Sequence, residues 1–198
     1  MHNVARVSGR THQADAASFA AMKVRRVVTG HDETGRSVFA SDEDVEPTTV
    51  PLFAGWEFLE LWGGDTTPVF PDDGREPAHR DYFPKVDDFR FSFSVIPPEG
   101  TAAPEDLDMA VAEEEARRAL PGMLDVLEPD DPGMHTTDTI DFEVILSGEL
   151  ILELDDGAER LLKAGDTVVQ NGTRHRWRNP GSEPCVMAVF MVGAERGA

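Results

Sequence analysis

Two histidines that lie 40 residues apart, His135 and His175, constrain the fold of this chain more than any other feature. Each lies beside an apolar stretch with the pattern of a strand, and a glycine turn closes each stretch. Short strands joined by glycine turns are typical of β-barrels and sandwiches. Such a barrel can enclose one metal ion or one small ligand. The pattern therefore predicts an architecture and a site, and it says less about a substrate.

The composition excludes several classes of partner. The 198 residues include 38 acidic and 18 basic side chains, which gives a formal net charge of −20. A field of that sign repels phosphate backbones and anionic lipids, so we expect no nucleic-acid partner and no membrane partner. Cys185 is the single cysteine, so no intrachain disulfide and no cysteine zinc site can form. The N-terminus has no secretory signal pattern, which predicts a cytoplasmic location.

The order of patterns predicts a mobile leader at residues 1–21 and a single domain at 22–198. A helix is expected at 104–120, between Pro104 and Pro121, either as a plain surface helix or as a cap over the barrel mouth. The chain is otherwise rich in strand patterns, expected near 23–28, 56–62, 89–95, 140–146, 149–154, 159–162, 167–170, 175–178 and 185–192.

The segment from 133 to 179 resembles the two conserved motifs of the cupin superfamily. The first motif is matched by Gly133, His135 and Gly148, and the second by Gly165, Gly172, His175 and Asn179. The resemblance implies an all-β fold: a single antiparallel cupin β-barrel of the jelly-roll type, from about residue 23 to 192. It also implies a homodimer, which would satisfy the edge strands expected within residues 23–62.

The departures from the cupin pattern fall on the residues that would do the chemistry. Thr137 stands where the family has a second histidine, Asp141 stands where it has a glutamate, and Gln170 replaces a proline. By resemblance, His135, Asp141 and His175 form the candidate ligand set for a divalent ion such as Fe, Mn, Zn or Ni. The alternative is a metal-free pocket in which Asp141 hydrogen-bonds a histidine.

Three further residues are candidates for the wall of a substrate pocket: Thr137, Gln170 and Trp177. Arg174, Arg176 and Arg178 alternate along the second motif. They are interpreted as solvated, although one at the rim could bind a substrate carboxylate.

The resemblance favours an enzyme acting on a small organic acid, phenol or carbonyl compound, of the oxygenase, decarboxylase, isomerase or lyase type. In that case Asp141 is either the third metal ligand or a general base whose pKa is raised by burial. The alternative function is a metal-free cupin that binds a small molecule without catalysis.

Overall fold

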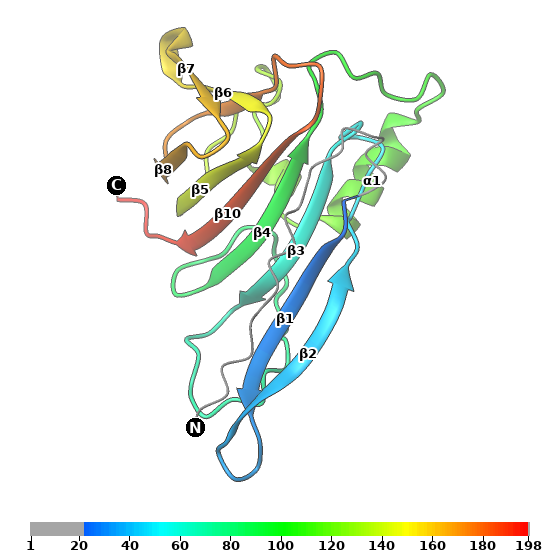
Figure 1. The fold of residues 1–198 in the computed structure, drawn as a ribbon. Helices are drawn as coiled ribbons and strands as arrows, with labels where there is room; N and C mark the ends of the chain where they lie inside the picture. The colour runs from blue at the N-terminus through cyan, green and yellow to red at the C-terminus, as the bar shows by residue number, and fades with distance from the viewer. Residues whose placement is uncertain (1–21, 198) are drawn as a thin grey trace, which may run out of the picture.

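The computed structural model describes residues 22–197, which form two antiparallel sheets around one core, with a separate hairpin and one α-helix (Figure 1). The predicted leader at 1–21 lies outside the described residues. The large sheet has the order β3 (Glu57–Gly64), β4 (Phe89–Ile96), β10 (Cys185–Gly193), β5 (Thr139–Ser147) and β8 (Thr167–Asn171). The small sheet has the order β7 (Glu159–Lys163), β6 (Glu149–Glu153) and β9 (Arg176–Arg178).

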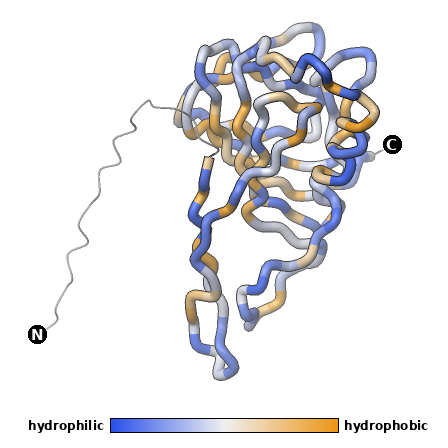
Figure 2. Tube along the Cα trace, turned by 90° about the vertical axis from the view of Figure 1, so that its right-hand side faces the viewer, coloured by the Kyte–Doolittle hydropathy of each residue, from blue (hydrophilic) through white to orange (hydrophobic). Residues whose placement is uncertain are grey.

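Neighbouring strands in both sheets pair antiparallel, as the all-β prediction requires. Side chains from both sheets meet in one hydrophobic core, in which Ile145 and Met187 of the large sheet pack with Leu150 of the small one. These sheets are the antiparallel barrel that the glycine turns and short strands predicted. Figure 2 shows hydrophobic and hydrophilic residues alternating along the strands of its body.

The helix α1 (Met109–Ala119) begins five residues later than Pro104, where the sequence placed its start. The reason is the side chain of Asp108, which accepts hydrogen bonds from the backbone N–H groups of Ala110 and Val111 and so caps the helix. Ala116 and the following Leu120 pack into the main core, so α1 and the short helix η1 (Met123–Asp125) close one part of the barrel. In residues 22–197 no helix has the length and hydropathy needed to cross a bilayer.

Strand β4 turns its apolar side away from the barrel interior. Phe91 is exposed on the outer face, whereas Ser92 and Ser94 are buried and point inward. The strict alternation of apolar and polar residues predicted a strand here. In the structure the polar residues of this alternation point inward. Strand β5 follows the same rule, because Asp141 and Glu143 are buried between exposed apolar residues.

The opening hairpin, β1 (Val24–His31) and β2 (Ser37–Val45), forms a two-stranded sheet of its own. Val24 and Val45 of this hairpin pack against a second hydrophobic cluster on the outer face of the large sheet. That cluster contains Leu59, Leu61, Val95 and Val186. The hairpin therefore covers one end of the outer face and leaves the rest of it open.

Gly148, the glycine of the first motif, joins β5 to β6 where two parts of the chain approach closely. Its φ is +76°, and a Cβ atom there would lie 2.9 Å from the Cα of Cys185. Gly157 has a similar φ of +69° but open space around the same position. The two glycines thus share a backbone conformation and differ in packing.

We predict that Gly157→Ala lowers the free energy of unfolding by about 1 kcal/mol, the cost of a left-handed residue with a side chain. Gly148→Ala should lower it by about 2 kcal/mol more, because the added methyl overpacks the β5–β6 turn. Urea unfolding of both variants measures the difference. Equal losses would contradict the close approach at Gly148.

Candidate functional site

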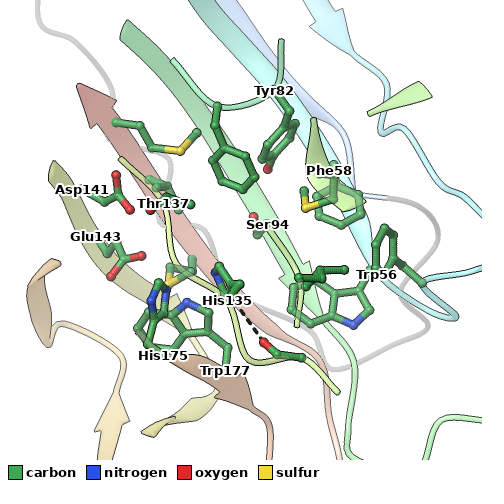
Figure 3. Close-up of a pocket in the computed structure, with 18 residues that line it drawn as sticks. Trp56, Phe58, Tyr82, Ser94, His135, Thr137, Asp141, Glu143, His175 and Trp177 are labelled. Atoms are coloured by element: carbon green, nitrogen blue, oxygen red, sulfur yellow. Dashed lines mark hydrogen bonds between the residues drawn. The ribbon is translucent and has the colours of Figure 1, made fainter. Parts of the chain in front are cut away.

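A cavity of about 260 Å³ lies inside the barrel (Figure 3). One side of it carries carboxyl groups from β5, and the opposite side is aromatic, with Trp56, Phe58 and Tyr82 shown facing the interior. Phe53 and Phe83 extend the aromatic side, and sulfur-containing side chains of β10 add to the apolar lining. The cavity therefore has a polar end and an apolar end, as expected for a site that binds a small amphipathic molecule.

His135 and His175 meet at the polar end, as the two motifs predicted. Their backbones form a reciprocal antiparallel bridge, with N–H···O distances of 2.9 Å in both directions, and their ring centroids are 4.1 Å apart. The Nδ1 atom of His135 lies 3.0 Å from the carbonyl oxygen of Gly133, and Nδ1 of His175 lies 2.9 Å from that of Thr173. A carbonyl can only accept, so Nδ1 carries the proton in both rings.

Both imidazoles are neutral near pH 7. Burial and, to a lesser degree, the adjacent His135 together lower the pKa of His175 to about 3. Burial also lowers the pKa of His135. With the proton fixed on Nδ1, each ring presents Nε2 as a hydrogen-bond acceptor or a metal donor.

The imidazole pair provides two of the donors that the predicted metal site needs. A backbone carbonyl that holds Nδ1–H is the usual support of a metal-bound histidine, so the imidazole pair fits an ion. The full set does not form, because no group of three or more His, Cys, Asp or Glu side chains within residues 22–197 is placed to hold one ion. The assignment of His135, Asp141 and His175 as metal ligands therefore stays a prediction from the motif.

Asp141 and Glu143 form a pair of carboxyl groups on the inner face of β5. They lie two positions apart, so the alternation of the strand points both into the cavity. Both are buried, and Oδ1 of Asp141 and Oε2 of Glu143 have no hydrogen-bond partner among the described residues. A buried polar atom without a partner is unfavourable, and it is expected where a ligand supplies the missing contact.

The environment separates the pKa values of the two carboxyls. Burial and, to a lesser degree, the neighbouring Asp141 together raise the pKa of Glu143 to about 8. Burial raises the pKa of Asp141 to about 6, opposed by the hydroxyl of Thr139. At neutral pH the pair therefore holds one proton, mainly on Glu143.

The predicted wall residues fall into two groups. Thr137 and Trp177 line the cavity; Thr137 accepts a hydrogen bond of 2.8 Å from the hydroxyl of Thr139, and Trp177 packs edge-on against His175. Gln170 is buried opposite Asp141 in the β5–β8 register but is not among the residues that line the cavity. Its amide donates to the carbonyl of Thr173, so it supports the turn that precedes His175.

The three arginines of the second motif are engaged in ion pairs on the outside of the barrel. Arg174 pairs with Glu128, Asp131 and Asp155, and Arg176 pairs with Asp131 and Glu153. Arg178 pairs with Glu153, Glu99 and Glu159. They are partly buried rather than simply solvated, and none of them lines the cavity.

Glu143 and the aromatic wall were not predicted. The signal for Glu143 was present, because it shares one face of an alternating strand with Asp141. The wall residues Trp56, Phe58 and Tyr82 come from segments more than 50 residues before the motifs. They reach the site only through the pairing of β3 with β4, which no local pattern specifies.

Comparison with known proteins identifies a family and several relatives. The sequence pattern of the family described as "Cupin domain" matches residues 123–192. Over 169 residues, the chain is 33% identical to phomopsin biosynthesis cluster protein C' of Diaporthe leptostromiformis, covering 84% of this chain and 76% of that protein. The chain belongs to the cupin superfamily.

Two further relatives match this cupin over shorter stretches. Oryzines biosynthesis cluster protein J of Aspergillus oryzae is 46% identical over 62 residues, 31% of this chain and 35% of that protein. The cupin-domain-containing oxidoreductase virC of Hypocrea virens is 37% identical over 46 residues, 23% of this chain and 24% of that protein. In both cases the match spans well under two thirds of the relative.

The raised pKa of Glu143 predicts how stability changes with pH. The folded protein holds this proton more tightly than the unfolded chain, so folding becomes less favourable as pH rises from 4.5, the ordinary value, to about 8. Glu143→Gln removes that loss, so its stability relative to the wild type should rise by on the order of 5 kcal/mol between pH 4 and pH 9.

Urea unfolding of wild type and variant from pH 4 to pH 9 measures this difference. Glu113→Gln, at an exposed position of α1, is the matched control and should run parallel to the wild type. A constant difference between wild type and Glu143→Gln across the range would show that Glu143 is not buried as described.

Proposed function

We propose that this cupin is an enzyme that binds a small organic compound in the barrel cavity and moves a proton with Asp141 and Glu143. Reactions that begin with removal of an acidic proton beside a carbonyl, or from a phenol, fit this machinery: isomerisation or elimination. The proposal rests on one observation, the pair of buried carboxyls whose oxygens lack partners and face an apolar cavity.

The two carboxyls suit different roles. Asp141 has the lower pKa, about 6, and is mostly ionised at neutral pH, so it acts as the general base. Glu143 has a pKa of about 8 and is protonated at the same pH, so it donates a hydrogen bond or a proton to the substrate oxygen. Two titratable groups held at different pKa values are a recurring means of assigning base and acid in one site.

The aromatic wall and the relatives support a small-molecule substrate. Trp56, Phe58 and Tyr82 offer an apolar surface that positions a hydrocarbon body and excludes water from the carboxyls. Two of the relatives carry names that place them in biosynthesis clusters. A role in making or modifying a small organic compound agrees with both. The cytoplasmic location stays a prediction from the sequence.

Hydrogen–deuterium exchange tests the proposed chemistry before a natural substrate is known. With 1-phenylpropan-2-one in D₂O, the wild type should accelerate exchange of the benzylic protons above the buffer rate, followed by NMR. Asp141→Asn should reduce this enzyme-dependent rate by about 100-fold, because the amide cannot accept the proton. Glu113→Gln should exchange at the wild-type rate.

Two outcomes would count against the proposal. Exchange at the same rate with Asp141→Asn would remove Asp141 as the base. Binding of the ketone with no accelerated exchange would favour the alternative function, a cupin that binds a small molecule without catalysis.

A metal-dependent enzyme with the same cavity is the second candidate. It is favoured by the two imidazoles, whose Nε2 atoms are free while backbone carbonyls hold Nδ1–H. His135 and His175 would hold the ion, which would supply Lewis-acid polarisation of a substrate oxygen or redox chemistry. The oxidoreductase name of the Hypocrea virens relative agrees with the second possibility.

Elemental analysis separates the two candidates. Protein purified without chelator or added metal should retain well under one equivalent of Fe, Mn, Zn or Ni, because a third donor is not in place beside the imidazoles. Thr137→His adds an imidazole to the cavity wall and should increase retention. A stoichiometric ion in the wild type that is lost in His175→Ala would instead establish the metal-dependent candidate.

The predicted homodimer has a surface that fits it. Beyond the hairpin, the outer face of the large sheet exposes large apolar side chains on four adjacent strands, and an exposed apolar patch of this kind marks an interface. The patch consists of Phe91, Phe142, Val144, Leu146, Val169 and Phe190. We propose that a second copy packs on this patch, rather than joining an edge of β1 or β2.

The apolar patch predicts the effect of polar substitutions on assembly. Wild type should scatter light at twice the monomer mass of 21.7 kDa. The double variant Phe142→Ser and Phe190→Ser should be monomeric, because both rings lie at the centre of the patch. Phe39→Ser, at a residue of β2 that is 79% exposed, should stay dimeric. A wild type that is monomeric at every concentration would refute the dimer.

A further inference from the structure

The polar end of the cavity is rich in hydrogen-bond acceptors. Asp141 and Glu143 contribute carboxyl oxygens without partners, and His135 and His175 contribute neutral Nε2 atoms. No lysine or arginine is among the described residues that line the cavity. A ligand seated here must therefore donate hydrogen bonds, and a negatively charged group would find no positive partner.

These acceptors come from separate parts of the chain. The carboxyls lie on β5, whereas His135 precedes β5 and His175 precedes β9, and no three of these groups among the described residues are placed to hold one ion. A single ion needs its donors to converge at one point. Acceptors at separate positions instead match an organic group that carries several N–H donors. A protonated amine is the most compact group of this kind.

The opposite side of the cavity accommodates a hydrocarbon body. Trp56 and Phe58 stack with ring centroids 5.8 Å apart, and Tyr82 packs edge-on against Phe58 at the same separation. This wall is apolar, and its ring faces favour a nearby cation over an anion. The wall and the carboxyls together match an amphipathic molecule with one positive end.

The net charge of the protein also favours a cationic ligand over an anionic one. The net charge of −20 gives a field that repels anions and raises the local concentration of cations. The arginines nearest to the motif are paired with acidic residues on the outer surface, so they offer no binding site for a substrate carboxylate. An organic acid therefore fits this cupin poorly.

We infer that the cavity binds a compact amphipathic amine, with its ammonium group at Asp141 and Glu143 and its hydrocarbon body against Trp56, Phe58 and Tyr82. This inference rests on the proposed function in one respect, namely that the barrel cavity is the substrate site. It narrows the substrate class by removing organic acids and adding a positive charge. An amino ketone combines this charge with the acidic proton that Asp141 would remove.

Calorimetric titration of the full-length protein with three matched probes tests the inference. The probes are 2-phenylethylamine, 2-phenylethanol and phenylacetate, which share a phenyl ring and differ in charge. The amine should bind at least about tenfold more tightly than the alcohol, because its hydrogen bonds to carboxylates are charge-assisted. Phenylacetate should show no binding at the same concentrations.

Asp141→Asn identifies the contact. It should weaken binding of the amine by about tenfold and leave binding of the alcohol within about twofold, because the amide keeps the shape of Asp141 and loses its negative charge. Glu113→Gln should bind all three probes as the wild type does. Circular dichroism of each variant checks that the barrel is folded.

Three results would overturn the inference: phenylacetate binding as tightly as the amine, amine affinity unchanged in Asp141→Asn, or no binding of the amine at millimolar concentration. These results leave the proposed function open to its own test, because 1-phenylpropan-2-one carries no charge and its exchange is measured separately. Failure of that exchange, with amine binding intact, would refute the catalysis alone.

Discussion

The register of β5 between β10 and β8 decides what the cavity of this cupin contains. Asp141 pairs with Met191 on one side and with Gln170 on the other, and this alignment points Asp141 and Glu143 inward. Side chains alternate along a strand, so a slip of one residue would place Phe142 in the cavity and both carboxyls outside. The slip would have to break the ladders on both sides of β5.

This register buries carboxyl groups and exposes apolar side chains, and both placements are unfavourable for folding. Two neighbouring carboxyls are buried inside the barrel, each with one oxygen that has no hydrogen-bond partner among residues 22–197, while phenylalanines are exposed on the outer face. Elsewhere the structure handles buried charge differently: Glu153, on the outer face of the small sheet, is neutralised by Arg176 and Arg178. Departures from favourable burial concentrate at functional surfaces, and here they coincide with the proposed site and the proposed interface.

Local patterns in the sequence predicted the strands, the barrel and the meeting of His135 with His175. These features follow from alternation, glycine turns and motif spacing, all of which act over short stretches of chain. The sequence did not predict the role of Glu143, because alternation groups residues 141 and 143 on one face without saying whether that face is inside or whether a partner neutralises it. The same limit applies to β4, where Ser94 and none of the phenylalanines lines the cavity.

The aromatic wall and the ligand chemistry depend on contacts between distant segments. Trp56 and Tyr82 reach the carboxyls of β5 only after β3, β4 and β10 have paired in order. The motif predicted a metal site, and its departures at Thr137 and Asp141 were compatible with either a metal site or a metal-free pocket. The sequence alone does not place the other hydrogen-bond acceptors of the cavity, which bear on this choice. The acidic partners of the three motif arginines lie far from them in the sequence, so no local pattern predicted these ion pairs. Because the arginines are paired, they are not available to bind a substrate carboxylate.

The protonation state of the carboxyl pair is the most direct test of the proposed site. A ¹³C NMR titration of the side-chain carboxyl carbons, with Asp141→Asn and Glu143→Gln used for assignment, measures both pKa values. We expect Glu143 to titrate with a pKa of about 8 and Asp141 with a pKa of about 6. If Glu143 and Asp141 titrate at their ordinary values of 4.5 and 3.8, they are not buried as a pair, and the proposed acid–base site is wrong.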